Sequence, residues 1–454
     1  MATYKLDLDV LNKLTGTHID LVNLAGGGIG LAPGLKLVLD KGSGNVADYY
    51  DSGNSRRVMT LGGSDALYLE TSALNLLGRY LKNPKGFGGS AGSLVRLVDS
   101  ASGLKAAIES AQNGIVWILP GTYAIDVDCK NDPISIPDNC TLIAFGAEMK
   151  FRNQNAGGYW GNKMFDASNV SYEVHGGKWW IDRANSVDDD ARKLFEVRNG
   201  AMATFRGCWL SNDSGREAIC ATNSGTRVKC FNCFFQPQQN TYSSNQFIYG
   251  GNGASLFIDG CVFDGFYPGQ TAIRNDVGIG IYPKGNCVSK ISNSIFRYLK
   301  GGVGIEHWNY GTDSRFIHIS GCDFVDTDST MADYCPIYFR TAAAAAAGYN
   351  LYDVTIESCT FKGGSSAMGQ IGTKRNDNGQ TGIKRLVIRN CTMIAAGEYT
   401  TAKYAIDFRE AGSGGTAVEI AQISNLFISS GYGTSQVNLA SGIPLGKYDV
   451  TLES

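Results

Sequence analysis

A short motif that returns about every 30 residues limits this chain to a small set of folds. The motif reads IDGCVF at residues 258–263 and recurs in looser form as FRGCWL, CFNCFF, ISNSIF, ISGCDF, IESCTF and IRNCTM. A unit of this length cannot bury its apolar residues alone, so consecutive units have to stack on one another. The repeat therefore predicts a solenoid.

Two positions of the motif predict a sharp bend. The position before the Cys holds Gly, Asn or Ser in every copy, and Gly and Asn tolerate a left-handed backbone better than other residues do. The Cys position also accepts Gly177, Ser294 and Leu426, which fits packing at a corner and argues against ligation. Cys230 and Cys233 form a CxxC, but no second pair completes a zinc site. We expect twelve free thiols, no metal and no cofactor.

A second apolar segment precedes each motif, and its side chains alternate between apolar and polar. Each period thus holds at least two short strands, a bend and a loop of variable length, with no room for an amphipathic helix of about ten residues. Strands that stack with one bend per turn form a parallel β-helix, and the irregular period favours the right-handed type. We predict an all-β chain with about ten coils, roughly 50 Å long at about 4.8 Å per coil.

The segment before the first coil reads SLVRLVDSASGLKAAIESAQNGIVWILPGTYAID, residues 93–126. It predicts a short Ser-capped helix that leads through Asn113-Gly114 into a strand ending in Pro-Gly-Thr-Tyr, and such a helix would plug the open end of a solenoid. Together with the coils, this segment resembles the pectate-lyase-like right-handed β-helix superfamily, especially phage tailspike proteins. The resemblance covers roughly residues 93–435. We expect a small N-terminal domain of short strands over residues 1–92, a β-helix over 93–435 and a short tail over 436–454.

The tailspike resemblance implies a homotrimer on a virion. In tailspikes, a small N-terminal domain attaches to the particle and the β-helix faces host polysaccharide, so residues 1–92 are expected to bind other virion proteins. The tail of about 20 residues leaves no room for a large C-terminal domain, which favours a shorter collar, head or baseplate appendage.

Charge and hydropathy argue against nucleic acid or a membrane as a partner. The net charge is −2 and no basic run exceeds Arg56-Arg57, so we expect neither nucleic-acid binding nor attraction to an anionic membrane. No run of about 18 apolar residues predicts a membrane span. The start, MATYKLDLDV, lacks the apolar stretch of a secretory signal, so we expect synthesis in a host cytoplasm and assembly into the virion.

The candidate site lies on the outward face of the second strand set. Its outward positions are predicted to be Glu196, Cys220, Tyr249, Tyr282, Glu306, Arg340, Lys374 and Asp407. Glu306 is the candidate catalytic acid, with Asp323 or Asp326 as its partner, because glycosidases use two carboxylates. The candidate substrate-binding residues are aromatic groups that stack on sugars and basic groups that orient them, namely Tyr282, Trp308, Tyr338, Arg340 and Lys374.

Two other interpretations of these residues stay open. Glu306 and Arg340 could form a structural ion pair on a solvated strand face. Alternatively, the site could be that of a lyase, which would use Arg340, Lys374 and Arg409 near Tyr338 to neutralise a uronate. We carry three functions: a virion appendage that is structural or binds host glycan, a polysaccharide depolymerase (hydrolase or lyase), and a carbohydrate-active enzyme unrelated to phages. A groove with two carboxylates at a catalytic separation would distinguish the enzymes from the appendage.

Overall fold

The computed structural model describes residues 37–40, 45–51, 56–61, 65–69 and, in segments, residues 95–449. The segments of this last range that it leaves undescribed are 156–160, 187–192, 212–216, 239–245, 267–276, 283–286, 308–315, 328–333, 342–351, 368, 374–382, 409–417, 433–435 and 440–447. The chain divides into two compact units, Met1–Gly86 and Phe87–Ser454. This division falls close to the domain boundary predicted after residue 92. No helix among the described residues is long and apolar enough to cross a bilayer.

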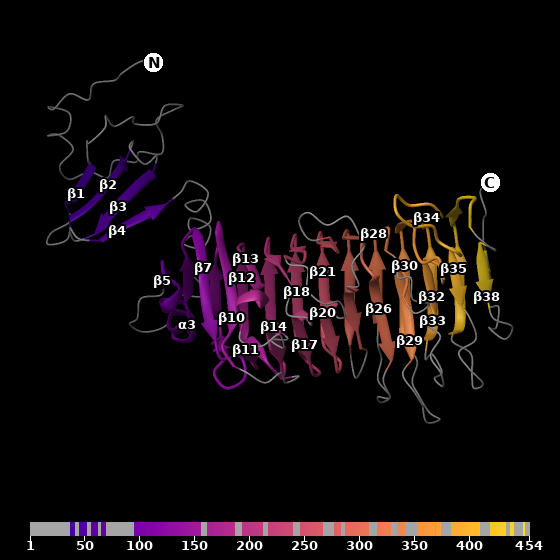
Figure 1. Cartoon of the computed structure of the whole chain (residues 1–454), viewed down its shortest axis with the longest axis horizontal. Coiled ribbons are helices and arrows are strands. Elements are labelled where there is room, and N and C mark those ends of the chain that lie inside the picture. Colours follow the sequence, from indigo (N-terminus) through magenta and orange to yellow (C-terminus); the bar gives the residue numbers. More distant parts are fainter. Residues whose placement is uncertain are drawn as a thin grey trace, which may run out of the picture. The chain divides into compact units, whose positions relative to one another are not determined.

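The first unit holds a four-stranded antiparallel sheet in the order β1-β2-β3-β4 (Figure 1). Its strands are β1 (Leu37–Asp40), β2 (Asn45–Asp51), β3 (Arg56–Leu61) and β4 (Asp65–Leu69). Short strands joined by turns were expected in this part of the chain.

The second unit is built from three parallel sheets, in which each strand pairs with its equivalent in the next coil. The coils follow one another along the unit in chain order (Figure 1). The sheet that carries the first half of each repeat, called here the motif sheet, has 13 strands. They are β5 (Val95–Val98), β6 (Ile115–Ile118), β9 (Cys140–Ile143), β12 (Ser171–His175), β15 (Met202–Arg206), β18 (Arg227–Phe231), β21 (Ser255–Asp259), β24 (Val288–Ser292), β27 (Phe316–Ser320), β30 (Tyr352–Glu357), β33 (Ile383–Arg389), β36 (Val418–Ser424) and β39 (Tyr448–Asp449).

After the bend, the chain enters the short-strand sheet of 11 strands. They are β7 (Gly121–Val127), β10 (Ala147–Asn153), β13 (Lys178–Ile181), β16 (Trp209–Leu210), β19 (Phe234–Phe235), β22 (Val262–Asp264), β25 (Ile295–Arg297), β28 (Asp323–Val325), β31 (Thr360–Lys362), β34 (Thr392–Ile394) and β37 (Phe427–Ile428). Most of these strands have only two or three residues.

The alternating sheet, formed by the second apolar segment of each period, also has 11 strands. They are β8 (Ile134–Ser135), β11 (Lys163–Ser168), β14 (Lys193–Arg198), β17 (Glu217–Thr222), β20 (Gln246–Gly251), β23 (Val277–Ile281), β26 (Gly301–His307), β29 (Ile337–Thr341), β32 (Ile371–Thr373), β35 (Ile406–Phe408) and β38 (Val437–Leu439). A 3-10 turn, η3 (Arg183–Asn185), follows β13.

Helix α3 (Ala101–Glu109) packs against β5 to β8 and buries Leu104 and Ile108 over the first coil, as expected of a plug. Two details differ from the prediction. Ser100 occupies the N-cap position, but its side chain makes no capping hydrogen bond. The Pro-Gly-Thr-Tyr segment does not end a strand, because β6 ends at Ile118 and Gly121 opens β7.

At the bend between the motif sheet and the short-strand sheet, one residue adopts the left-handed backbone conformation, as predicted. Asn232, Asn293 and Asn390 have φ angles of 53°, 50° and 54°. The apolar residue two positions after each Cys points inward and forms a ladder along the core. Its Phe rings lie parallel at centroid separations of 4.5 Å (Phe235–Phe263), 4.7 Å (Phe263–Phe296) and 4.9 Å (Phe296–Phe324).

All twelve cysteines are free and buried. In the corner column, the thiols of Cys208, Cys261 and Cys322 donate to backbone carbonyls of the preceding coil at 3.4 to 3.7 Å. Burial raises the pKa of the Cys140 thiol to about 12. These thiols are packing groups of the core.

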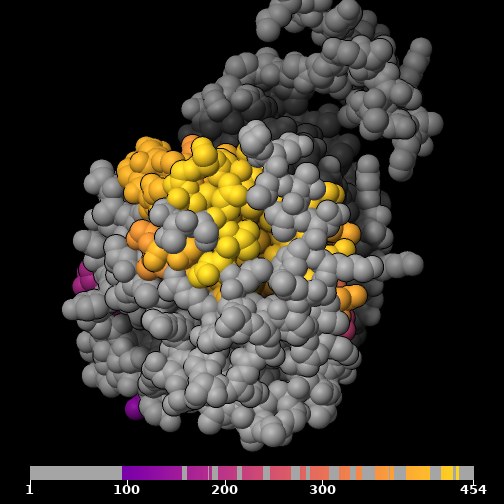
Figure 2. All heavy atoms as spheres, turned by 90° about the vertical axis from the view of Figure 1, so that its right-hand side faces the viewer, coloured from indigo at the N-terminus to yellow at the C-terminus, as the bar shows by residue number. Residues whose placement is uncertain are grey.

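The last coil extends into the segment that was predicted as a tail. Strand β38 pairs with β35, and β39 pairs with β36. Figure 2 looks onto this end of the unit, where C-terminal residues, drawn in yellow, reach the surface (Figure 2). Phe427 in β37 is 45% exposed there.

Candidate functional site

The strand register divides the predicted outward column into two. Tyr249 pairs with Gly280, and Gly304 pairs with Tyr338, whereas Glu306 pairs with Arg340 two residues further along. Tyr282 follows the second column, because the residue before it, Ile281, pairs with Ile305. The predicted set therefore mixes two neighbouring columns of one face.

Tyr338 has no exposed surface on which a sugar could stack. Its side chain is fully buried and packs with Val277, Cys335 and the ring of Tyr334, whose centroid lies 5.0 Å away. The ring also lies so close to Gly304 that a β-carbon at that position would overlap with it. This burial corrects the prediction for Tyr338.

Tyr282 is half-buried and lies beside Tyr249, with ring centroids 4.6 Å apart. The amide Nε2 of Gln246 donates to the Tyr282 hydroxyl at 3.3 Å. Strands β26 and β29 place the backbones of Glu306 and Arg340 side by side, while Trp308, Lys374 and the side chains of Glu306 and Arg340 lie outside the described residues.

The two predicted partners of Glu306 lie in a different sheet. Asp323 is exposed at the start of β28 in the short-strand sheet, and the motif-sheet strand β27 separates it along the chain from β26, which carries Glu306. Asp326 follows β28 and is fully buried. The described geometry therefore does not bring Glu306 and either aspartate together on one face.

Asp326 instead anchors a hairpin from two coils further along the chain. Its carboxylate accepts hydrogen bonds from the backbone N–H groups of Glu398, Tyr399 and Thr400 at 3.0, 3.1 and 3.0 Å. The hydroxyl of Thr400 donates to the same carboxylate at 3.0 Å. Successive backbone N–H groups that converge on one anion form a nest, so a carboxylate here is held as a structural acceptor.

This return hairpin, Ala396–Thr401, lies directly over the coil between its own and that of Asp326. It is closed by a bridge between Ala396 and Thr401 and by a hydrogen bond from Gly397 N to Thr400 O at 2.7 Å. The backbone N–H of Gly364 donates to the Thr400 hydroxyl at 2.9 Å. A β-carbon at Gly397 would overlap with Asp326 Oδ1, so the close approach requires glycine.

The hairpin carries Tyr399 back to two earlier coils and completes an aromatic platform. The rings of Phe266 and Tyr298 stack at 4.1 Å with an interplanar angle of 7°. Tyr399 meets both edge-on, with centroids 5.9 Å from Phe266 and 5.6 Å from Tyr298. Tyr399 is 51% exposed, while Phe266 and Tyr298 are half-buried. We call these three residues the platform.

The backbone at Tyr298 is unusual. Its φ angle is 57°, which costs energy for a bulky side chain, and its N–H donates to Val325 O at 3.1 Å. This left-handed residue ends the short strand and holds the Tyr298 ring against Phe266. The strained corner therefore serves to orient the platform.

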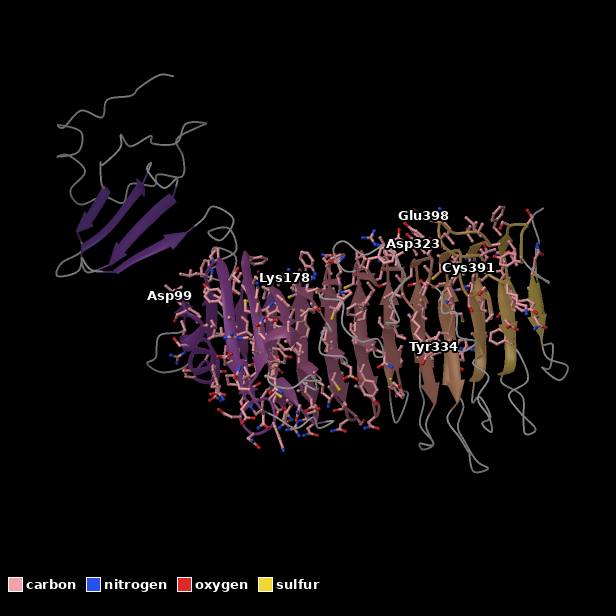
Figure 3. All side chains as sticks on the ribbon, in the orientation of Figure 1. Asp99, Lys178, Asp323, Tyr334, Cys391 and Glu398 are labelled. Atoms are coloured by element: carbon pink, nitrogen blue, oxygen red, sulfur yellow. The ribbon has the colours of Figure 1, made fainter. Side chains whose placement is uncertain are left out.

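Charged groups surround the platform. Arg297 pairs with the buried carboxylate of Asp264 at 2.8 Å, and its guanidinium lies 5.8 Å from the Tyr298 ring. The carboxylate of Glu398 raises the pKa of Tyr399, and burial together with Glu398 raises the pKa of Tyr298. Both phenols are therefore neutral hydrogen-bond donors near pH 7. Glu398 and Asp323 are labelled on the same edge of the unit in Figure 3.

A second carboxylate pair, on the alternating sheet, is neutralised by its neighbours. Asp166 and Glu196 are register partners in adjacent coils, β11 and β14. Lys163 binds Glu196 at 2.7 Å, and Arg198 binds Asp166 at 2.8 Å. Burial works to raise the pKa of both carboxyls, but these cations and Lys193 outweigh it and hold both below their usual range. The pair is ionised and is unsuited to general-acid catalysis.

Sequence reasoning missed the platform because its three residues come from three separate turns. Phe266 and Tyr298 follow the short strands β22 and β25, in the sequences VFDGF and IFRYL, where an aromatic residue follows the inward Phe. That recurrence is a weak signal, and nothing in the sequence shows that residue 399 returns to these coils.

No protein-family model matches the sequence, and no curated protein sequence matches it. Among solved structures, the endo-xylogalacturonan hydrolase of Aspergillus tubingensis is similar with a TM-score of 0.51 and 14% identity, over 79% of this chain and 99% of that one. A mutant tailspike protein of the E. coli bacteriophage HK620, in complex with a pentasaccharide, is similar with a TM-score of 0.51 and 12% identity, over 84% of this chain and 69% of that one. Identities this low show the fold alone. The second unit of this chain is a right-handed parallel β-helix, as the repeat predicted.

Proposed function

We propose that this chain is a glycan-binding surface appendage of a tailed-phage virion, and that the platform contacts the sugar. The observation that carries the proposal is Tyr399, an aromatic side chain that is 51% exposed and held against two other rings. Exposed aromatic faces bind the apolar faces of sugar rings, and neighbouring polar groups select their hydroxyls. Glu398 and Arg297 supply such polar groups beside the rings.

The platform is held in place before any ligand arrives. Phe266 and Tyr298 are stacked, and the backbone of the hairpin is bound to a buried carboxylate. Binding therefore orders few side chains, and more of the interaction energy is available for affinity. A rigid aromatic cluster on an otherwise charged edge is typical of a recognition surface.

The similar solved structures support a role with glycans. By their descriptions, one is a hydrolase of xylogalacturonan and the other binds a pentasaccharide. In keeping with the tailspike resemblance, we propose that the chain is a homotrimer whose residues 1–92 bind other virion proteins. The proposed ligand is a polysaccharide of the bacterial surface.

The test of the binding role is a panel of bacterial capsular and O-antigen polysaccharides presented to wild type and to Tyr399→Ala. We expect at least one polysaccharide to bind, and Tyr399→Ala to weaken that binding by about tenfold, a loss of roughly 1.4 kcal/mol from the removed aromatic contact. Phe427→Ala is the matched control, because Phe427 is a similarly exposed aromatic side chain of the same unit. Equal binding by wild type and both variants would reject the platform.

The depolymerase alternative is tested in the same panel. Polymer size, new reducing ends and unsaturated-uronate absorbance are followed over time. Cleavage that is lost in Glu306→Gln, with binding retained, would identify an enzyme and name its acid. Binding without cleavage would leave recognition as the function.

A further inference from the structure

A stretch of the motif sheet carries basic side chains that form no ion pair with the described acidic residues. The exposed cations on the outer face of β15, β18 and β24 are Arg206, Arg227, Lys229 and Lys290. None of the four has a carboxylate within ion-pair distance among the described residues. We call these four residues the basic stripe.

Charged side chains on either side of the stripe are paired. On β12, Glu173 is hydrogen-bonded to His175 at 2.9 Å, and the more distant positive charges of Arg206 and Lys229 also act on its carboxylate. On β30 and β33, Arg385 binds Asp353 at 3.2 Å and Arg389 binds Glu357 at 2.5 Å. The described charged side chains of these flanking strands are therefore paired, whereas the four cations of the basic stripe are not.

The one acidic side chain within the stripe is already used. Asp259 on β21 accepts hydrogen bonds from Ser292 Oγ at 2.7 Å and from Asn293 Nδ2 at 2.9 Å. Four cations against this carboxylate leave the stretch positive, although the whole chain has a net charge of −2. A local excess of one sign raises the concentration of the opposite ion at the surface.

Two of the cations occupy the same register position in different coils, and an aromatic residue occupies that position in the coil between them. Lys229 pairs with Phe257, and Phe257 pairs with Lys290. The two lysines are thus two coils apart, roughly 10 Å at about 4.8 Å per coil. Phe257 is half-buried and faces outward, and the Arg206 guanidinium lies 4.5 Å from the Phe231 ring, which limits its motion.

We propose that the basic stripe binds an acidic polysaccharide that lies along the coils and carries its acid group on alternate sugars. The separation of Lys229 and Lys290 is close to the length of an extended disaccharide, so each lysine meets one carboxylate while the intervening sugar stacks on Phe257. The site is in a different sheet from the platform, and the proposal does not depend on the platform.

The experiment compares the full chain with Lys229→Ala/Lys290→Ala. The probes are hyaluronate, which has one carboxylate per disaccharide, polygalacturonate, which has one on every sugar, neutral dextran and duplex DNA of similar length. We expect hyaluronate to bind most tightly, its affinity to fall as salt is raised, and the double variant to lose at least tenfold. Dextran binding should not differ between wild type and the variant.

The control is Lys130→Ala/Lys362→Ala, which removes two exposed lysines outside the motif sheet and gives the same change in net charge. We expect this control to bind hyaluronate as wild type does, and circular dichroism to show both double variants folded. Three results would overturn the proposal: no binding of hyaluronate at low salt, an equal loss in the control, or tighter binding of DNA or polygalacturonate. The last would assign the stripe to another polyanion.

Discussion

Asp326 and Thr400 are 74 residues apart, and their side chains are hydrogen-bonded at 3.0 Å across an intervening coil. Contacts in a solenoid are mainly between neighbouring coils. This contact skips one coil, and through Tyr399 the hairpin reaches two coils further back. The result is a brace that ties together coils from Phe266 to Thr401 along one edge.

We predict that Asp326→Asn lowers the free energy of unfolding by about 1–3 kcal/mol. The amide NH2 of Asn would face N–H and O–H groups that now donate hydrogen bonds to the carboxylate. Urea denaturation measures this change. Asp323→Asn is the control, since Asp323 is exposed on the same coil, and it should change stability by no more than about 0.5 kcal/mol. Equal effects of the two variants would show that the brace is not stabilising.

Gly397→Ala should displace the hairpin while leaving the coils intact. The new β-carbon would overlap with Asp326 Oδ1, and the buried carboxylate cannot move away without losing its donors. We expect loss of platform-dependent glycan binding and faster proteolysis near residue 397. Gly103→Ala in helix α3 is the contrasting control, because its β-carbon meets nothing closer than 3.4 Å and should stabilise the helix by roughly 0.5–1 kcal/mol. Unchanged glycan binding by Gly397→Ala would show that binding does not depend on the position of the hairpin.

The coils were predictable from sequence because each copy of the motif obeys the same local physics. Asn232 or Gly260 before the corner fixes the bend, and Phe263 two residues after the Cys fixes the inward side. The third strand was not predicted, since strands such as β16 (Trp209–Leu210) are too short to show an alternation. The last coil was missed for a similar reason, because β39 (Tyr448–Asp449) has no motif of its own.

The candidate site was less predictable because it depends on register and on long-range contacts. The predicted column slips by two residues between Tyr249, which pairs with Gly280, and Tyr282. Tyr338 was selected as a sugar-binding residue, and its burial could not be read from the sequence. Asp326 was selected as an acid, and its burial under residues 397–400 could not be read from the sequence. The net charge likewise conceals the basic stripe, because the acidic residues that balance it lie elsewhere on the chain.

We predict that Phe296→Ala lowers the free energy of unfolding by about 3–5 kcal/mol, because it opens a cavity in the stacked Phe ladder. Phe296 is fully buried between Phe263 and Phe324. Chemical denaturation of Phe296→Ala and of the exposed Phe427→Ala provides the comparison, and the latter should lose no more than about 0.5 kcal/mol. Similar losses would mean that the buried ladder contributes no more to stability than an exposed ring does.

The ionised pair Asp166 and Glu196 predicts how stability depends on pH. Both carboxyls have folded-state pKa values below their usual values of 3.8 and 4.5, so their contribution is fully present above those usual values and is lost as pH falls through the lowered ones. Glu196→Gln removes one titrating group, takes this ion pair from Lys193 and leaves Lys163 with Asp166 alone, so it should be less stable than wild type at pH 7. Its melting temperature should fall less between pH 7 and pH 3 than that of wild type, by on the order of 2 °C. Differential scanning calorimetry across this range measures both slopes. Parallel slopes for the two proteins would show that Glu196 titrates normally and that the cluster does not shift its pKa.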